Sequence, residues 1–330
     1  PELSELIDKQ IGRDWREHFE ELGKLNAYTA NEETLSEFIQ VKGKKKEQLF
    51  RYIEKTEGVK IDGERILYAQ VKRLHEYKRQ LMTAFALLRL YYDLKDGKLK
   101  DFTPSVFLFG AKSAPSYFRA KGIIKYINEI IKLINADPET NGRLTGVFVT
   151  EYNVSYAEKI VAATDVSLQV STAGLEASGT GNMKFMMNGA VTLGTMDGAN
   201  VEIREQVGDE NMFLFGMTAE EVDALWRRGY DPHDFMTPEL ERVMRMLTSG
   251  VLGQRFDDIY ASLLTNRFGT PDSYMTIADF QSYAAAQKRA SETYLDRDKF
   301  ASMMLVNTAK AGIFSSDRAV REYADNIWHL

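Results

Sequence analysis

The chain has 330 residues, of which 44% are hydrophobic and 27% are charged, and its formal net charge is −6. This composition is that of a globular protein and excludes a disordered chain, a fibrous repeat or a small disulfide scaffold. The absence of cysteine excludes disulfides and thiolate chemistry, the mild acidity argues against nucleic-acid binding, and the apolar runs are too short to span a membrane.

The first sixty residues interleave charged and apolar side chains, which predicts helices over 1–60. The segment begins without the basic and apolar regions of a signal peptide, so we expect a cytoplasmic protein. Asp62-Gly63 is a turn signal. The β-favouring run 66–71 follows, and Leu81 and Phe85 then open an apolar helical face.

The alternation of strands and helices continues through the middle of the chain. Short apolar runs predict further strands over 106–109, 146–149, 165–170 and 190–193. A helix is expected over 116–135, and shorter ones precede the last two strands. Continuous apolar strands separated by helices are typical of a parallel sheet covered on both faces, and therefore of a doubly wound α/β fold.

From Thr218 onward the pattern is helical. Thr218 and Glu221 have capping-box spacing, and Thr237-Pro238 predicts another helix start. A final helix is expected after residues 315–317. We therefore expect one α/β unit with extra helices at both ends: a helical lead-in over 1–60, a Rossmann-like core over 61–217 and a helical extension over 218–330.

A glycine-rich stretch of small residues, 171–181, precedes a short predicted helix. Gly179 and Gly181 allow backbone to approach a ligand closely. If the helix begins near Thr180, its free N–H groups form an anion site without any basic side chain. The alternative is that both glycines only punctuate a loop.

Lys184 follows one turn later, among apolar neighbours. A lysine desolvated there has a lowered pKa, and its neutral amine can attack an aldehyde. This interpretation makes Lys184 a candidate Schiff-base lysine. The alternative is that its side chain extends to water.

A basic cluster lies where the strand 66–71 meets the next helix. Lys72, Arg73 and Lys78 fall at the carboxyl end of that strand, where parallel sheets bind ligands. Cations near a helix start are unfavourable, which a bound anion explains. A solvated helix start, with Glu76 paired to one base, is the alternative.

Tyr152 also follows a strand, and its hydroxyl could reach a phosphate, although core packing alone also explains a tyrosine there. The four histidines are dispersed and no pair has the spacing of metal ligands, so we expect no metal site. An aldehyde-binding lysine beside an anion site suits one molecule in particular, pyridoxal phosphate.

Three segments carry a resemblance to a known family. Residues 176–203, 70–81 and 314–328 resemble motifs of the α-glucan phosphorylases, and the similarity runs through the whole chain. The resemblance covers only the C-terminal domain of that family. It implies that an N-terminal domain, which forms the other wall of the active-site cleft in a two-domain fold, lies outside this chain.

The resemblance implies reversible phosphorolysis of α-1,4-glucans to α-glucose 1-phosphate, with inorganic phosphate as co-substrate. Lys184 then holds pyridoxal phosphate as a Schiff base, and the cofactor phosphate acts as an acid–base relay. A homodimer is implied for the full-length enzyme. The isolated chain is expected to be inactive.

The resemblance also implies roles for individual residues. Lys72 and Lys78 lie near the cofactor phosphate, and Arg73 binds the substrate phosphate. Thr180 and Gly181 supply backbone donors to the cofactor phosphate and Tyr152 a hydroxyl donor. The positions implied to bind the glucosyl unit are Glu176, Ala177, Ser178 and Gly179.

The sequence departs from the family pattern at two positions. Asn153 stands where animal enzymes have an arginine, and Leu168 stands where several members have an acid. Two other classes compete with a phosphorylase domain: a sugar-nucleotide glycosyltransferase of similar fold, which needs no lysine at 184, and a non-enzymatic Rossmann-like binding module.

Overall fold

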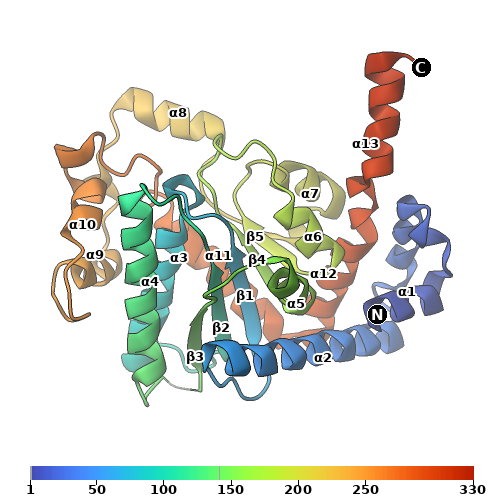
Figure 1. The fold of residues 1–330 in the computed structure, drawn as a ribbon, viewed down its shortest axis with the longest axis horizontal. Helices are drawn as coiled ribbons and strands as arrows, with labels where there is room; N and C mark the ends of the chain where they lie inside the picture. Colours follow the sequence, from blue (N-terminus) through green and yellow to red (C-terminus); the bar gives the residue numbers. More distant parts are fainter. Residues whose placement is uncertain (1, 141) are drawn as a thin grey trace.

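A computed structural model describes residues 2–140 and 142–330. Its centre is a sheet of six parallel strands in the order β3-β2-β1-β4-β5-β6 (Figure 1). The strands are β1 (Ile66–Val71), β2 (Ser105–Gly110), β3 (Leu144–Phe148), β4 (Val166–Gln169), β5 (Val191–Gly194) and β6 (Phe213–Leu214). The predicted parallel sheet is therefore confirmed.

Helices cover both faces of the sheet. On one face, β1 directs Ile66 and Tyr68 into the core shared with α3 (Gln80–Lys95) and α4 (Phe118–Ala136). On the other face, β1 directs Leu67 and Ala69 toward the opposite covering layer. The helices of that layer are α2 (Glu32–Glu57), α5 (Val154–Ala163) and α6 (Gly181–Met187). Because successive strand residues point to opposite faces, a strand covered twice must be apolar throughout.

The strand order reverses beside β1. β1 pairs with β2 on one side and with β4 on the other, where Tyr68 is in register with Val166. The chain leaves the carboxyl ends of these two central strands in opposite directions. Such a reversal opens a crevice that binds ligands in doubly wound folds.

The predicted extra helices are present at both ends. α1 (Glu2–Ile11) precedes α2. α7 (Asn200–Val207) connects β5 to β6 within the core, and the helices after β6 form the C-terminal extension. They are α8 (Ala219–Arg228), α9 (Pro238–Met244), α10 (Asp257–Leu264), α11 (Phe280–Leu295), α12 (Arg297–Lys310) and α13 (Ser316–Tyr323). Thr218 and Glu221 form the expected capping box, and Thr237 caps α9 ahead of Pro238.

Two elements differ from the sequence expectation. β6 spans only two residues and was not predicted, because so short a run shows no period. The N-terminal helical region includes a ten-residue 3₁₀ segment, Phe19–Tyr28, in addition to α-helices.

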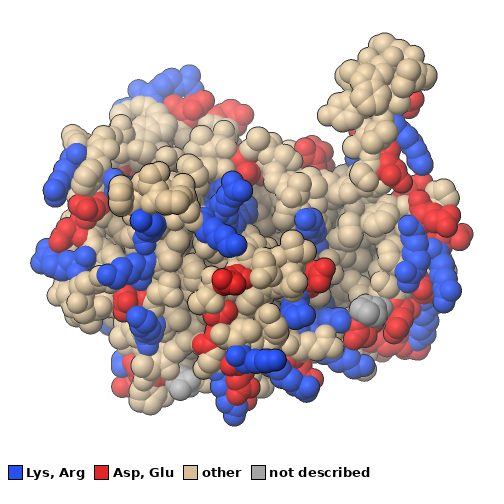
Figure 2. Space-filling model, viewed as in Figure 1, with Lys and Arg blue, Asp and Glu red and all other residues tan. Residues whose placement is uncertain are grey.

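The C-terminal α13 projects away from the body of the protein (Figure 1), and it ends in a π-helical turn, Ala324–Trp328. The tip of this projection is uncharged in Figure 2, whereas acidic and basic side chains lie along its base and are interspersed over the body. Within the described residues, no helix combines the length and apolar character needed to cross a membrane.

Candidate active site

Three of the predicted site residues meet at the carboxyl ends of β1 and β4. Lys72 follows β1, Lys78 ends a 3₁₀ turn, η3 (Glu76–Lys78), and Glu176 lies in the loop after β4. The Nζ atom of Lys72 is 3.9 Å from Oε2 of Glu176, and the Lys78 ammonium donates to the same oxygen. Each of the three side chains is 16% exposed. Two lysines therefore share one carboxylate, and all three side chains are largely buried.

The pKa values of Lys72 and Lys78 are shifted in opposite directions. Burial lowers the pKa of Lys72 to about 8, although the charge of Glu176 opposes this shift. Burial also acts to lower the pKa of Lys78, but hydrogen bonds to Glu176 and Tyr77 outweigh it and raise the pKa overall. Lys78 therefore stays charged at neutral pH, whereas Lys72 titrates just above it.

Arg73 lies on the same connection as Lys72, between β1 and η3. Its side chain is exposed, and its carbonyl accepts a hydrogen bond from Nε2 of Gln80 at 3.1 Å. The backbone of Arg73 is thus held to the start of α3. Its guanidinium faces solvent at the edge of the site.

Asp197 shapes the loop that carries Glu176. Its carboxylate accepts hydrogen bonds from the Ser171 hydroxyl at 2.6 Å and from the backbone N–H groups of Gly174 and Glu176, both at 3.0 Å. The next residue, Gly198, has φ +53°, and a Cβ there would lie 2.4 Å from the Ser178 carbonyl oxygen. Sequence reasoning missed Asp197, although the Asp-Gly pair was a signal for a tight turn.

Arg79 holds the start of the same loop through hydrogen bonds from its side chain. Its fully buried guanidinium donates to the carbonyls of Val170 and Ser171, at 2.7 and 2.9 Å. It also donates to Oδ2 of Asp279 at 2.6 Å. Arg79 adopts a left-handed φ of +53°, which is rare outside glycine. Arg79 follows Lys78, so one buried side chain ties η3 to the loop 171–176. This residue was also missed, because its acidic partner lies far away in the sequence.

The helix expected near Thr180 is present as α6. Thr180 occupies the N-cap position, but its side chain makes no capping hydrogen bond. Gly179, with φ +92°, and the exposed Gly181 have no side chains, so the backbone at the start of α6 is left uncovered. The N–H of Met183 donates to Oδ1 of Asn182 at 3.1 Å, whereas no capping bond from Thr180 satisfies the other N–H groups of the first turn.

Lys184 is exposed, so of the two interpretations its side chain extends to water in this structure. Phe185 and Met186 are buried on the core side of α6. Because adjacent residues of a helix point about 100° apart, apolar neighbours in sequence do not enclose Lys184. Its amine is directly accessible.

Tyr152 lies beside the ends of two strands. A Cβ added at Gly110, the last residue of β2, would lie 2.9 Å from Val71 and 3.3 Å from the Tyr152 ring. Burial raises the pKa of the Tyr152 hydroxyl, so it remains a protonated donor at neutral pH. Asn153 caps α5 by accepting a hydrogen bond from the Tyr156 N–H at 3.0 Å.

The remaining predicted contacts lie on the loop between β4 and α6. Ala177 and Ser178 are exposed, and the Ser178 carbonyl accepts a hydrogen bond from the N–H of Ala199 at 2.8 Å. Leu168, by contrast, is 1% exposed within β4 and belongs to the core.

The donor set suits pyridoxal phosphate. An accessible amine on α6, an uncapped first turn, two ammonium groups and a tyrosine hydroxyl match an aldehyde and a phosphate dianion. The carboxylate of Glu176 contacts both ammonium groups of this cluster. No group of three or more acidic or histidine side chains in the described part of the chain could hold a metal ion.

The sheet order and the cluster after β1 define a doubly wound α/β domain with two lysines and a carboxylate at its switch point. The family model for carbohydrate phosphorylases matches residues 1–330. The chain therefore belongs to the carbohydrate phosphorylase family.

Curated relatives extend this likeness over the whole chain. Glycogen phosphorylase of Synechocystis sp. is 42% identical over 332 residues, and the liver form of Homo sapiens is 40% identical over 332 residues. The muscle form of Oryctolagus cuniculus is 41% identical over 330 residues. These alignments cover 99–100% of this chain but only 39% of each relative.

Proposed function

We propose that this chain carries the cofactor-binding half of an α-glucan phosphorylase, which converts α-1,4-glucan and inorganic phosphate to α-glucose 1-phosphate. The observation that supports this most directly is the Lys72–Lys78–Glu176 cluster. The loop that holds Glu176 leads straight into α6, and α6 presents Lys184.

In this proposal Lys184 attaches pyridoxal phosphate covalently. Its amine would hold the aldehyde carbon of that group, with loss of water. The N–H groups at Thr180 and Gly181, the ammonium groups of Lys72 and Lys78 and the Tyr152 hydroxyl hold the cofactor phosphate. When bound, the cofactor supplies a phosphate that exchanges a proton with the substrate phosphate.

The substrates meet the other residues of the loop and of the basic cluster. The exposed guanidinium of Arg73 binds the substrate phosphate in a charge-assisted contact. Glu176 and the neighbouring positions 177–179 bind the glucosyl unit, with Glu176 oriented by Lys78 and by Asp197. Glu176 thus links the sugar to the cations that stabilise phosphate.

The chain spans 39% of the length of the relatives that it matches. We propose that an N-terminal domain of the relatives' kind forms the opposite wall of the cleft, and that the complete enzyme is a cytoplasmic homodimer. The chain alone then folds but lacks turnover, because water enters a site with one wall.

Cofactor uptake separates this function from the other classes. The purified chain is mixed with pyridoxal phosphate, and the absorbance of covalently bound cofactor is recorded. A sugar-nucleotide glycosyltransferase or a binding module has no use for an aldehyde and shows none. Lys184→Ala is the control variant.

Release of glucose 1-phosphate from maltodextrin tests the two-wall requirement. We expect none from the chain alone with cofactor supplied, and a return of activity when a separately made N-terminal domain is added. Turnover by the chain alone, free of contaminating full-length enzyme, contradicts the requirement for a second wall.

A further inference from the structure

Lys42, on α2, is buried at a place where two helices end. It is 3% exposed, and its Nζ donates to the carbonyls of Ala162 and Thr164, both at 2.8 Å, and of Asn188 at 3.1 Å. Ala162 lies in the last turn of α5, Thr164 is the C-cap of α5, and Asn188 is the C-cap of α6. One ammonium group therefore serves the C-terminal ends of both helices.

This arrangement suits the electrostatics of helix ends. The last carbonyls of a helix have no partner within the helix and carry partial negative charge, so a cation is favourable there. Burial lowers the pKa of Lys42 to about 7, and in its charged form the ammonium has three N–H bonds, which match the three carbonyls in number. The nearby acid, Asp165, is already paired with Lys46 at 3.0 Å. Lys42 is thus committed to backbone carbonyls rather than to a carboxylate.

A short series of hydrogen bonds connects Lys42 with Lys184. Lys42 binds the carbonyl of Asn188, and the Asn188 side-chain amide donates to the carbonyl of Lys184 at 2.9 Å. The backbone N–H of Asn188 also approaches that carbonyl, at 3.3 Å. The last turn of α6, which carries Lys184, is consequently tied to α2 through Asn188.

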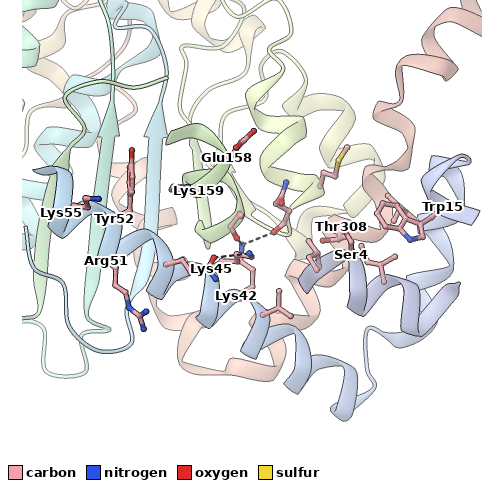
Figure 3. Close-up of a pocket in the computed structure, with 18 residues that line it drawn as sticks. Ser4, Trp15, Lys42, Lys45, Arg51, Tyr52, Lys55, Glu158, Lys159 and Thr308 are labelled. Atoms are coloured by element: carbon pink, nitrogen blue, oxygen red, sulfur yellow. Dashed lines mark hydrogen bonds between the residues drawn. The ribbon is translucent and has the colours of Figure 1, made fainter. Parts of the chain in front are cut away.

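The same turn also packs closely against α2 and α12. A Cβ added at Gly189, which follows it, would lie 2.6 Å from Phe38 of α2 and 3.2 Å from Oγ1 of Thr308 of α12. Met187 and Asn188 line a groove of about 820 Å³ together with residues of α2 (Figure 3). Lys42 lies at this groove, and the dashed lines in Figure 3 mark its hydrogen bonds to the lining residues.

We propose that Lys42 is a positioning residue that locks α5 and α6 together, and so sets the place of Lys184 relative to Tyr152. The other ends of these two helices carry groups assigned to the cofactor: Tyr152 precedes α5, and Thr180 and Gly181 begin α6. This inference rests on the proposed function for its cofactor, although the clamp itself rests on the hydrogen bonds alone.

Three variants of the cofactor-loaded protein test the proposal. Lys42→Met keeps the length of the side chain and removes all donors, whereas Lys42→Arg keeps charge and donors. Lys45→Met is the matched control, because Lys45 lines the same groove from α2 but pairs with Glu2 instead of the helix ends. The induced circular dichroism of bound cofactor and its first-order release rate are measured at saturating cofactor.

We expect Lys42→Met to release the cofactor about tenfold faster, the effect of losing a hydrogen bond with a charged donor, and to alter the dichroic band. Lys42→Arg restores part of both signals, and Lys45→Met matches the unmodified protein. An unchanged release rate and band in Lys42→Met overturns the proposal. If Lys42→Met does not fold, Lys42→Gln, which keeps two N–H donors without charge, takes its place with the same criteria.

Hydrogen exchange without cofactor separates this inference from the proposed function. We expect the amides of 181–188 to exchange faster in Lys42→Met than in Lys45→Met. Equal exchange overturns the clamp even if Lys184 binds cofactor. Two results together separate the proposals. If exchange is faster in Lys42→Met while the unmodified protein takes up no cofactor at Lys184, the clamp is supported and the proposed function is overturned.

Discussion

The Nη1 atom of Arg79 lies 2.6 Å from Oδ2 of Asp279, and the two side chains are 0% and 2% exposed. This buried ion pair joins the turn after β1 to the segment that leads into α11. The guanidinium simultaneously holds the carbonyls of Val170 and Ser171. This ion pair therefore stabilises the folded chain and also holds the start of the loop between β4 and α6, residues 170–180, which we call the ligand loop.

Asp279→Asn keeps the shape of the side chain and leaves Arg79 charged without its partner. We expect the free energy of unfolding to fall by about 3–5 kcal/mol, because an uncompensated charge remains buried. Urea unfolding measures the change. Glu292→Gln is the control, since its pair with Lys288 is exposed and should contribute less than about 1 kcal/mol. A similar small loss for both variants contradicts the assignment.

The lowered pKa of Lys72 predicts that anion binding depends on pH. As pH rises through about 8, Lys72 loses its charge, whereas Lys78, whose pKa is raised, keeps its own. We expect sulfate, whose charge is constant in this range, to bind about tenfold more weakly at about pH 9.5 than at about pH 6.5. Calorimetric titration measures the affinity.

Lys72→Met serves as the control, because it should lack this step in affinity.

The effect of the Lys72 pKa on folding stability has the opposite sign. The pKa of Lys72 in the folded chain lies below its ordinary value of 10.5, so the unfolded chain binds more protons between about pH 8 and 10.5. The contribution of Lys72 to stability therefore rises with pH in that window. A step in sulfate affinity that persists in Lys72→Met assigns it to another group.

Borohydride reduction of the cofactor-loaded protein should place the pyridoxyl group on Lys184. The amine is accessible, and its helix begins with an uncapped first turn that can hold the phosphate of the same cofactor. Peptide mapping identifies the modified lysine. Lys159, another exposed lysine, is an internal control that should stay unmodified at stoichiometric cofactor. A pyridoxyl group on a lysine other than 184 contradicts the assignment.

Arg73→Ala in the full-length enzyme should abolish phosphorolysis and leave the cofactor bound. Loss of one charge-assisted contact with substrate phosphate costs about 1.5–3 kcal/mol before effects on the transition state are added. Initial rates and cofactor absorbance are measured together. Lys112→Ala removes an exposed cation after the neighbouring strand β2 and should have little effect. Near-normal turnover, or loss of cofactor, argues against this division of roles.

Gly198→Ala should disturb the ligand loop through contact with its backbone. The new Cβ meets the Ser178 carbonyl oxygen at 2.4 Å, whereas a Cβ at Gly253 meets nothing within 4 Å, although both glycines have positive φ. We expect Gly253→Ala to cost about 1 kcal/mol of stability and Gly198→Ala about 3 kcal/mol. Thermal unfolding compares them, and equal losses would show that Ser178 moves aside freely.

The sequence predicted the layers of the fold and the members of the basic cluster. Five of the six strands follow from short apolar runs, and Lys72 and Lys78 meet Glu176 because the carboxyl ends of parallel strands share one edge. These features depend on local periodicity and on one general rule of topology. They need no knowledge of distant contacts.

The supporting residues could not be predicted in the same way. Arg79 and Lys42 find their partners only after the chain has folded, and no local pattern marks the carbonyls that Lys42 binds. The two interpretations of Lys184 could not be separated from the sequence for another reason. Its apolar neighbours suggested desolvation, although Phe185 and Met186 are buried on a different side of α6.

The separation of Arg79 and Asp279 also has a consequence for biosynthesis. The two residues are 200 positions apart. At 5–20 residues per second, a ribosome needs roughly 10–40 s to deliver the carboxylate after the arginine. During that interval Asp279 is not yet available to pair with the Arg79 guanidinium. The turn beside Lys78 therefore stays hydrated. The nascent ligand loop therefore closes late, after α11 has been synthesised.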